Sequence, residues 1–148
     1  MTCNSVSLRV LVVDDEIAVA DSLAMILQTF GYQVLVCYCA EHAVIAGSEF
    51  APQVLISDVV MPGMNGIELA RYYTAHHPDC KLLLISGNVA TGQLADAAAA
   101  QGRLPTIMAK PVHPAEILRF VAACGPVPVR DETIRARPSI NRFSTPSL

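Results

Sequence analysis

The sequence has few charged residues and no excess of positive charge. Of its 148 residues, 16% are charged and 53% are hydrophobic, and the net charge is −3 with an isoelectric point near 5.7. A protein that binds nucleic acid mainly by neutralising phosphates needs a basic surface, so this balance argues against such a role. The length and the apolar content instead indicate one domain with an ordinary hydrophobic core.

The chain also lacks an apolar run of membrane-spanning length. The run Val10 to Val13 stops at three acidic residues, whereas a membrane span needs about 20 apolar residues. Residues 1–7 show no basic segment followed by a long apolar one, as a secretory signal would. We therefore expect a soluble, cytoplasmic protein with no membrane partner.

Cysteine and histidine do not occur at metal-binding spacings. The five cysteines form an odd, scattered set without a C-x-x-C pair, and the four histidines show no ligand spacing. This usage fits reduced thiols better than a disulfide or zinc framework. A glycine-rich loop is also missing after the first apolar run, which disfavours a nucleotide-binding module.

Five short apolar runs alternate with segments of helical character. The predicted strands are 8–13, 33–38, 54–57, 81–85 and 105–109, and the predicted helices are about 17–30, 41–50, 67–76, 91–101 and 114–123. Strand–helix–strand units of this length close right-handed, with parallel strands. The sequence therefore predicts an α/β fold, a (βα)₅ doubly wound five-stranded parallel sheet in the flavodoxin-like order 2-1-3-4-5.

Composition divides the chain into three parts. We expect an N-terminal extension over 1–7, a folded domain over 8–124, and a proline-rich tail over 125–148 in which apolar periodicity is lost. The tail holds four arginines and two acids, a net charge of about +2, against about −5 for the rest. We expect the tail to be disordered, with a weak docking segment as the alternative.

The stretch 54–66, V-L-I-S-D-V-V-M-P-G-M-N-G, joins a buried strand to a sharp turn. Asp58 ends the strand, where open α/β sheets bind ligands and where a buried carboxylate is costly, so it is the candidate reactive group. Pro62, Gly63 and Gly66 favour a tight loop before the next helix. The stretch alone is equally compatible with an ordinary turn and a solvated aspartate.

Polar side chains follow four of the predicted strands. They are Asp14 and Asp15, Asp58, Ser86 and Lys110. The predicted strand order brings them to one edge of the sheet. Carboxylates at close quarters raise each other's pKa unless a cation offsets them, and an open oxygen site suits Mg²⁺. A carboxylate nucleophile with a lysine and a hydroxyl suits phosphoryl transfer to an aspartate.

Taken together, the pair Asp14-Asp15, the I-S-D-V-V-M-P-G-M-N-G stretch, Ser86-Gly87 and Lys110-Pro111 resemble the receiver domain of two-component response regulators. This CheY-like resemblance covers about residues 8–123 and indicates the single-domain type. It implies that Asp58 accepts a phosphoryl group from the phosphohistidine of a sensor histidine kinase or of a phosphotransfer protein. It also implies a signalling domain and not a classical enzyme.

The resemblance further assigns roles at the site. Asp15, Asp58 and the main-chain carbonyl of Val60 would bind Mg²⁺, and Asp14 would assist, often through water. Lys110 would pair with Asp58 or its phosphoryl group, and Ser86 would bond a phosphoryl oxygen. The remaining motif residues would support the loops, with a cis bond before the last of them; they are Pro62, Gly63, Gly66, Gly87 and Pro111.

Two positions depart from the family's pattern. Ile107 stands three residues before the lysine, where similar domains usually carry an aromatic ring that moves on activation. We expect Ile107 to pack inward in both states, with the output carried by the loop after Ser86 and by the fourth helix. Val60 is apolar where relatives with a polar residue orient an attacking water, which predicts a long-lived aspartyl phosphate.

Other functions compete with this interpretation. A haloacid-dehalogenase phosphatase needs a second aspartate two residues after the nucleophile, and Val60 occupies that place. A phosphorylation-independent interaction module of the same fold, or the N-terminal part of a longer response regulator, are the alternatives that stay open. Expected partners are the kinase and an unidentified downstream protein, without direct DNA contact. A homodimer through the face of helix 4, strand 5 and helix 5 is a further possibility.

Overall fold

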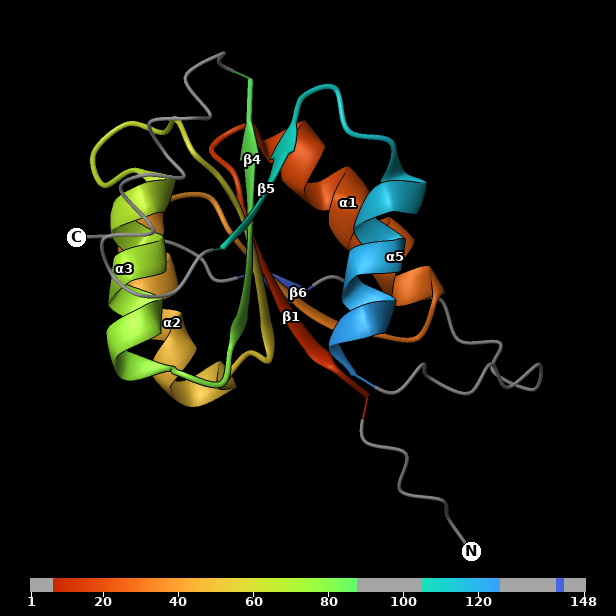
Figure 1. The fold of residues 1–148 in the computed structure, drawn as a ribbon, viewed down its shortest axis with the longest axis horizontal. Coiled ribbons are helices and arrows are strands. Elements are labelled where there is room, and N and C mark those ends of the chain that lie inside the picture. Colours follow the sequence, from red (N-terminus) through yellow and green to blue (C-terminus); the bar gives the residue numbers. More distant parts are fainter. Residues whose placement is uncertain (1–6, 88–104, 126–140, 143–148) are drawn as a thin grey trace, which may run out of the picture.

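The computed structural model describes residues 7–87, 105–125 and 141–142. Five parallel strands form the centre of the sheet in the order 2-1-3-4-5, as predicted (Figure 1). They are β1 (Arg9–Val13), β2 (Gln33–Cys37), β3 (Val54–Asp58), β4 (Lys81–Ser86) and β5 (Thr106–Ala109). Each predicted strand is present, with ends that differ by one residue or less.

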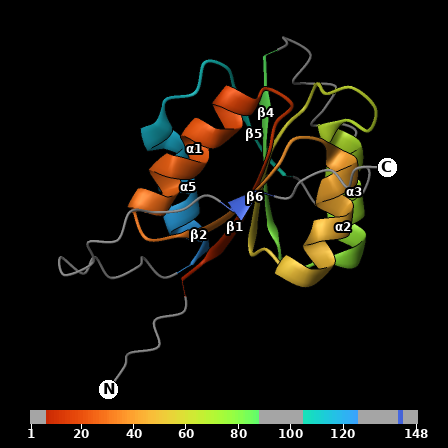
Figure 2. The same cartoon turned by 180° about the vertical axis from the view of Figure 1, so that it is seen from behind.

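Helices cover both faces of the sheet. The described helices are α1 (Ile17–Thr29), α2 (Ala40–Phe50), α3 (Gly66–His76) and α5 (Pro114–Cys124). Helices α1 and α5 lie on one face and α2 and α3 on the other (Figures 1 and 2). The predicted helix over 91–101 lies outside the described residues. No helix in the described ranges is long and apolar enough to cross a bilayer.

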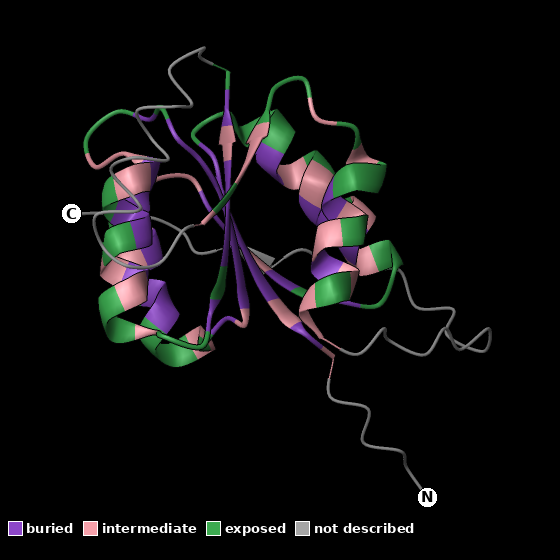
Figure 3. Ribbon diagram, viewed as in Figure 1, coloured by how far each residue is buried: buried purple, intermediate pink, exposed green. Residues whose placement is uncertain are grey.

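The core is divided in two by the sheet because successive strand residues point to opposite faces. Val10 and Val12 of β1 pack beneath α1 and α5, whereas Leu11 and Val13 pack beneath α2 and α3. Strands β1 and β3 and most of β2 and β4 are therefore apolar and buried on both faces, whereas β5 is only partly buried and the outer sides of the helices are exposed (Figure 3). The buried polar and charged side chains of the described residues lie at or next to the carboxyl ends of the strands; they are Asp14, Ser57, Asp58 and Ser86.

The start of α3 is defined by a reciprocal cap. The Asn65 side chain accepts a hydrogen bond from the Glu68 N–H (2.9 Å), and the Glu68 carboxylate accepts one from the Asn65 N–H (3.0 Å). This capping box satisfies two backbone donors of the first turn, so the helix begins at Gly66. The loop after β3 is consequently limited to the seven residues 59–65.

The tail contributes one strand that the sequence analysis did not predict. Asn141–Arg142 (β6) pairs in parallel with Leu35 and Val36, so the described sheet has six strands in the order 5-4-3-1-2-6. The tail is expected to be disordered, with a weak docking segment as the alternative; the structure describes only this short strand within it, and the rest of 126–148 lies outside the described residues. A two-residue strand is too short for side-chain periodicity, and its pairing uses backbone groups that a side-chain pattern does not reveal.

Candidate functional site

Three carboxylates meet at the carboxyl edge of the sheet. Asp58 is the last residue of β3, and Asp14 and Asp15 follow β1, which pairs with β3 as far as Val13 and Ser57. One carboxylate oxygen of each acid lies within 4.8 Å of those of the other two. Asp14 and Asp58 are buried and Asp15 is exposed. The acids predicted as ligands are thus brought together in a group that can hold a metal ion.

Asp14 is fixed by backbone hydrogen bonds in a buried position that disfavours its ionised form. Its N–H donates to the carbonyl of Cys37 (3.2 Å), and its Oδ1 accepts from the N–H of Glu16 (2.9 Å). Burial raises the pKa of Asp14 from 3.8 to about 6, against the lowering effect of the Glu16 hydrogen bond; Asp58 and Asp15 raise it further and Lys110 lowers it. A divalent cation would remove this penalty, because it favours the ionised acids.

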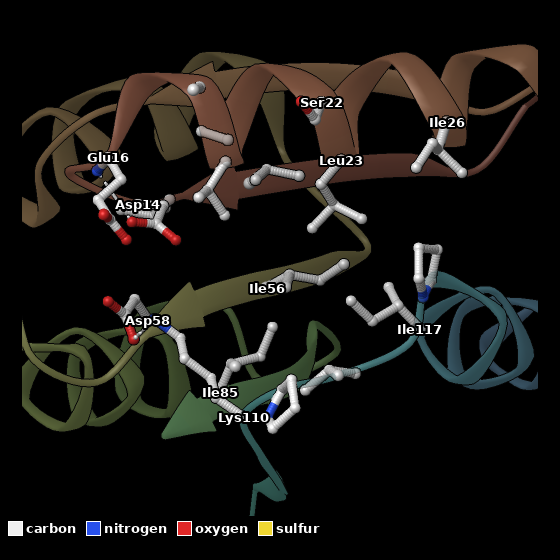
Figure 4. A pocket seen from close by; sticks show the side chains of 18 residues that line it. Asp14, Glu16, Ser22, Leu23, Ile26, Ile56, Asp58, Ile85, Lys110 and Ile117 are labelled. Carbon is white, nitrogen blue, oxygen red and sulfur yellow. Dashed lines mark hydrogen bonds and ion pairs between the residues drawn. The ribbon is translucent and has the colours of Figure 1, made fainter. Parts of the chain in front are cut away.

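Lys110 reaches the group of acids from the opposite side (Figure 4). Its Nζ lies 3.2 Å from Oδ1 of Asp58, and the side chain is one-third exposed. Burial lowers the pKa of Lys110, but the hydrogen bond and charge of Asp58, with Asp14 and Glu16, outweigh this effect and raise the pKa above its ordinary value. The amine is therefore a fixed positive charge beside Asp58.

The ends of β4 and β5 carry the other predicted residues. Ser86 is buried as the last residue of β4, and its carbonyl accepts a hydrogen bond from the Lys110 N–H (2.8 Å). Ile107 is partly buried and packs against the core on the α2 and α3 side. The Lys110–Pro111 peptide bond is cis, as the resemblance implies. A Cβ on Gly87 would make only ordinary contacts with Lys110, so space does not require a glycine there.

The loop after Asp58 is tightly packed. The N–H of Val59 donates both to Oδ1 of Asp58 and to the carbonyl of Ile85, each at 3.0 Å. Gly66 donates to the carbonyl of Val59 (2.8 Å), and a Cβ on Gly66 would collide with the backbone carbonyl of Asp58. A side chain at Gly66 would displace the loop that carries Asp58, so this glycine is a steric requirement of the site.

Further along the loop, Pro62 is exposed and Gly63 has a φ of +75°, which favours glycine. This turn is stabilised by Glu41, a residue that the sequence alone did not indicate. Glu41, in the first turn of α2, accepts a hydrogen bond from the Met64 N–H (2.9 Å), which lowers the pKa of its carboxyl. Nothing in local spacing indicates this contact, since the two residues are 23 positions apart.

A groove opens at the site between α1 and the segment that joins β5 to α5. Its volume is about 770 Å³, and its lining is mostly apolar, with Asp14, Asp58 and Lys110 at one end (Figure 4). Two side chains of the first turn of α1 are apolar and exposed: Ile17 at 57%, and Val19, which lines the groove, at 45%. Val60, in the loop after Asp58, is 65% exposed. Exposed apolar side chains thus occur in the groove itself, at Val19, and in the two segments that directly follow the acids, at Ile17 and Val60.

The fold and the strand-end acids define a class of signalling domain, and comparison with known proteins identifies it. The family model of the response regulator receiver domain matches residues 10–122. The chain belongs to this family and is a receiver domain of two-component signalling.

Relatives with curated functions match part of the chain. The DNA-binding response regulator MtrA of Mycolicibacterium paratuberculosis is 36% identical over 67 residues, 45% of this chain and 30% of its own length. The response regulator MprA of Mycobacterium bovis is 34% identical over 80 residues, 54% of this chain and 35% of its own. The matched region spans about a third of the length of these relatives.

Solved structures share the fold. The receiver domain protein from Methanospirillum hungatei superimposes with a TM-score of 0.73 at 25% identity, over 79% of this chain and 92% of that one. The chemotaxis protein CheY4 of Vibrio cholerae gives 0.71 at 24% identity, over 80% and 98%. The flavodoxin-like strand order predicted from the sequence is therefore confirmed both by the sheet and by these likenesses.

Proposed function

We propose that this protein is the phosphoacceptor of a two-component system or phosphorelay, and that Asp58 is the residue that becomes phosphorylated. The observation that carries the proposal is the juxtaposition of three carboxylates within 4.8 Å with a lysine 3.2 Å from Asp58. An acceptor needs a carboxylate nucleophile with positive charge placed where the phosphoryl oxygens arrive. We place the receiver within residues 8–124 and in the cytoplasm.

Mg²⁺ fits the donor set. Asp15, Asp58 and the carbonyl of Val60 would be its direct ligands, and Asp14 would act beside them; all are hard oxygen donors, as Mg²⁺ prefers. When bound, the ion supplies charge neutralisation for the acids and for the phosphoryl group. The chain's own contribution is to hold the acids at the carboxyl ends of two adjacent, buried strands.

The transfer itself breaks one bond and forms another. A carboxylate oxygen of Asp58 attacks the phosphorus of a phosphohistidine, the P–N bond breaks, and its electron pair remains on the imidazole of the donor. Lys110 would then pair with a phosphoryl oxygen in place of Asp58, and the Ser86 hydroxyl would bond another. Release of Lys110 from Asp58 is the event that we expect to alter the β4 and β5 ends and so the affinity for a downstream protein.

The donor is a sensor histidine kinase or a phosphotransfer protein. Val19 is apolar and exposed and lines the same groove as Asp58, so a protein donor can cover this surface while its histidine approaches the site.

The experiment is phosphorylation with acetyl phosphate and Mg²⁺, followed by intact-mass measurement. We expect the mass to rise by one phosphoryl group, and we expect Asp58→Asn or removal of Mg²⁺ to abolish the rise. Ser57→Ala, which changes the neighbouring buried residue and leaves the carboxylates intact, is the matched control and should still be modified. A protein that is folded but unmodified would show instead a module that acts without phosphate.

A further inference from the structure

Strands β5 and β2, which flank the other three of the five strands predicted from the sequence, differ in how their edges are protected. Strand β5 has four residues and is bounded by Pro105 before it and by Pro111 shortly after it. Proline and short length are two of the devices by which proteins prevent an edge strand from pairing with another chain. Strand β2, at the opposite side of the five central strands, has neither.

The β2 segment is well suited to unwanted pairing. Residues 33–38, Q-V-L-V-C-Y, contain no charged residue and no proline, and the strand is rich in β-branched and large apolar side chains. A short segment with high β-propensity and without charge or proline is the kind that pairs edge to edge when it is left open. This edge therefore requires a cover from elsewhere in the chain or from a partner.

The peptide groups of Val34 and Val36 in β2 point away from β1. The Gln33 N–H donates to the carbonyl of Leu8 (3.0 Å), and the Cys37 carbonyl accepts from the Asp14 N–H (3.2 Å), so residues 33 and 37 turn toward β1. Because peptide direction alternates along a strand, those of residues 34 and 36 face the other side. That is the side on which Asn141–Arg142 pairs, in register with Leu35 and Val36.

We propose that the segment at Asn141–Arg142 is a built-in cap for the β2 edge, which keeps this edge from pairing with a second copy of the chain. The occupant is the chain's own C-terminal segment, joined to the sheet by backbone hydrogen bonds as β6 (blue in Figure 2). Without it, two β2 edges related by a two-fold axis meet antiparallel and continue the sheet from one molecule into the next.

The test compares the full chain with the double variant Asn141→Pro/Arg142→Pro. Since N–H direction alternates, one of the two residues aims its N–H at β2, and the two prolines remove it whichever it is. We expect amide exchange at Val36, whose N–H faces β6 in this register, to become at least about five-fold faster, as loss of a backbone hydrogen bond implies. We also expect a mass near 15.8 kDa for the full chain and a concentration-dependent dimer for the variant, by light scattering.

Two further proteins complete the experiment. Asn141→Ala/Arg142→Ala keeps both N–H groups, so its amide exchange and its mass by light scattering should equal those of the full chain. A chain ended after Pro138 removes β6 without adding a proline and should reproduce both changes of the proline variant, with circular dichroism showing that the fold persists. The proposal is overturned if exchange at β2 is unchanged without β6, if the uncapped proteins stay monomeric over the same concentrations, or if the alanine variant behaves like the proline variant.

Discussion

The raised pKa of Asp14 predicts how the metal-free protein responds to pH. Asp14 is 6% exposed, and burial raises its pKa from 3.8 to about 6. Between these two values the folded protein binds a proton that the unfolded chain has released, so stability falls as pH rises from about 4 to about 6. At 1.36 kcal/mol per pKa unit, the free energy of unfolding loses about 3 kcal/mol over this interval through Asp14.

Asp14→Asn isolates this contribution. The asparagine Oδ1 can still accept the hydrogen bond from Glu16, while the side chain no longer titrates. In EDTA, the variant's advantage in free energy of unfolding over the wild type should grow from pH 4 to pH 6 and then level off at about 3 kcal/mol. Urea unfolding at a series of pH values measures it.

Mg²⁺ provides the second half of the same test. A bound cation favours the ionised acids, so saturating Mg²⁺ at pH 7 should stabilise the wild type and reduce or reverse the advantage of Asp14→Asn. If the stability advantage of Asp14→Asn does not change with pH, or is greatest at low pH, the ionised form of Asp14 is not destabilised by burial and the assignment is refuted. Carboxyl groups that do not interact with Asp14 titrate alike in both proteins and cancel in the comparison.

Three further predictions concern the rest of the site. Val60→Asn should shorten the lifetime of the aspartyl phosphate about ten-fold by orienting water, and an unchanged decay of the phosphorylated mass would contradict this. Val19→Glu should slow transfer from a protein donor about ten-fold but leave acetyl phosphate unaffected, whereas Met25→Glu, exposed on the same helix but outside the groove, should alter neither rate. Glu41→Ala should weaken Mg²⁺ binding about five-fold, because it removes one hydrogen bond to the loop that follows Asp58. Glu41→Gln should restore most of the affinity. Equal Mg²⁺ affinities of the wild type and Glu41→Ala in a calorimetric titration would exclude this positioning role.

Much of the fold and of the site followed from short-range patterns. Apolar runs that end in acids, a serine and a lysine identified the strands and the polar group at their ends, because a strand buried on both faces needs a continuous apolar sequence. Parallel closure places all the strand carboxyl ends at one edge of the sheet, and the flavodoxin-like order assumed for the strands then brought these ends together. The convergence of Asp14, Asp58 and Lys110 was therefore foreseeable, and the structure brings them together.

Contacts between distant exposed residues were not foreseeable. The hydrogen bond from Met64 to Glu41 joins two elements whose relative placement follows from the packing of α2 and α3 on the sheet, and no local pattern encodes it. The strand at Asn141–Arg142 is held by backbone groups, which every residue except proline possesses, so its sequence carries no distinctive signal.

By itself, the sequence determined which residues are buried and which acids stand at the strand ends, because burial and strand direction depend on residue type and order. Only the tertiary structure decided how much free energy the ionised acids cost the fold and which segment covers the β2 edge of the sheet. The pKa of Asp14 depends on the depth of its burial and on the nearness of Asp58 and Lys110. The strand that covers the edge of β2 comes from a segment about a hundred residues away along the chain. Electrostatic and backbone interactions of this kind act through space, and distances in space exist only once the chain has folded.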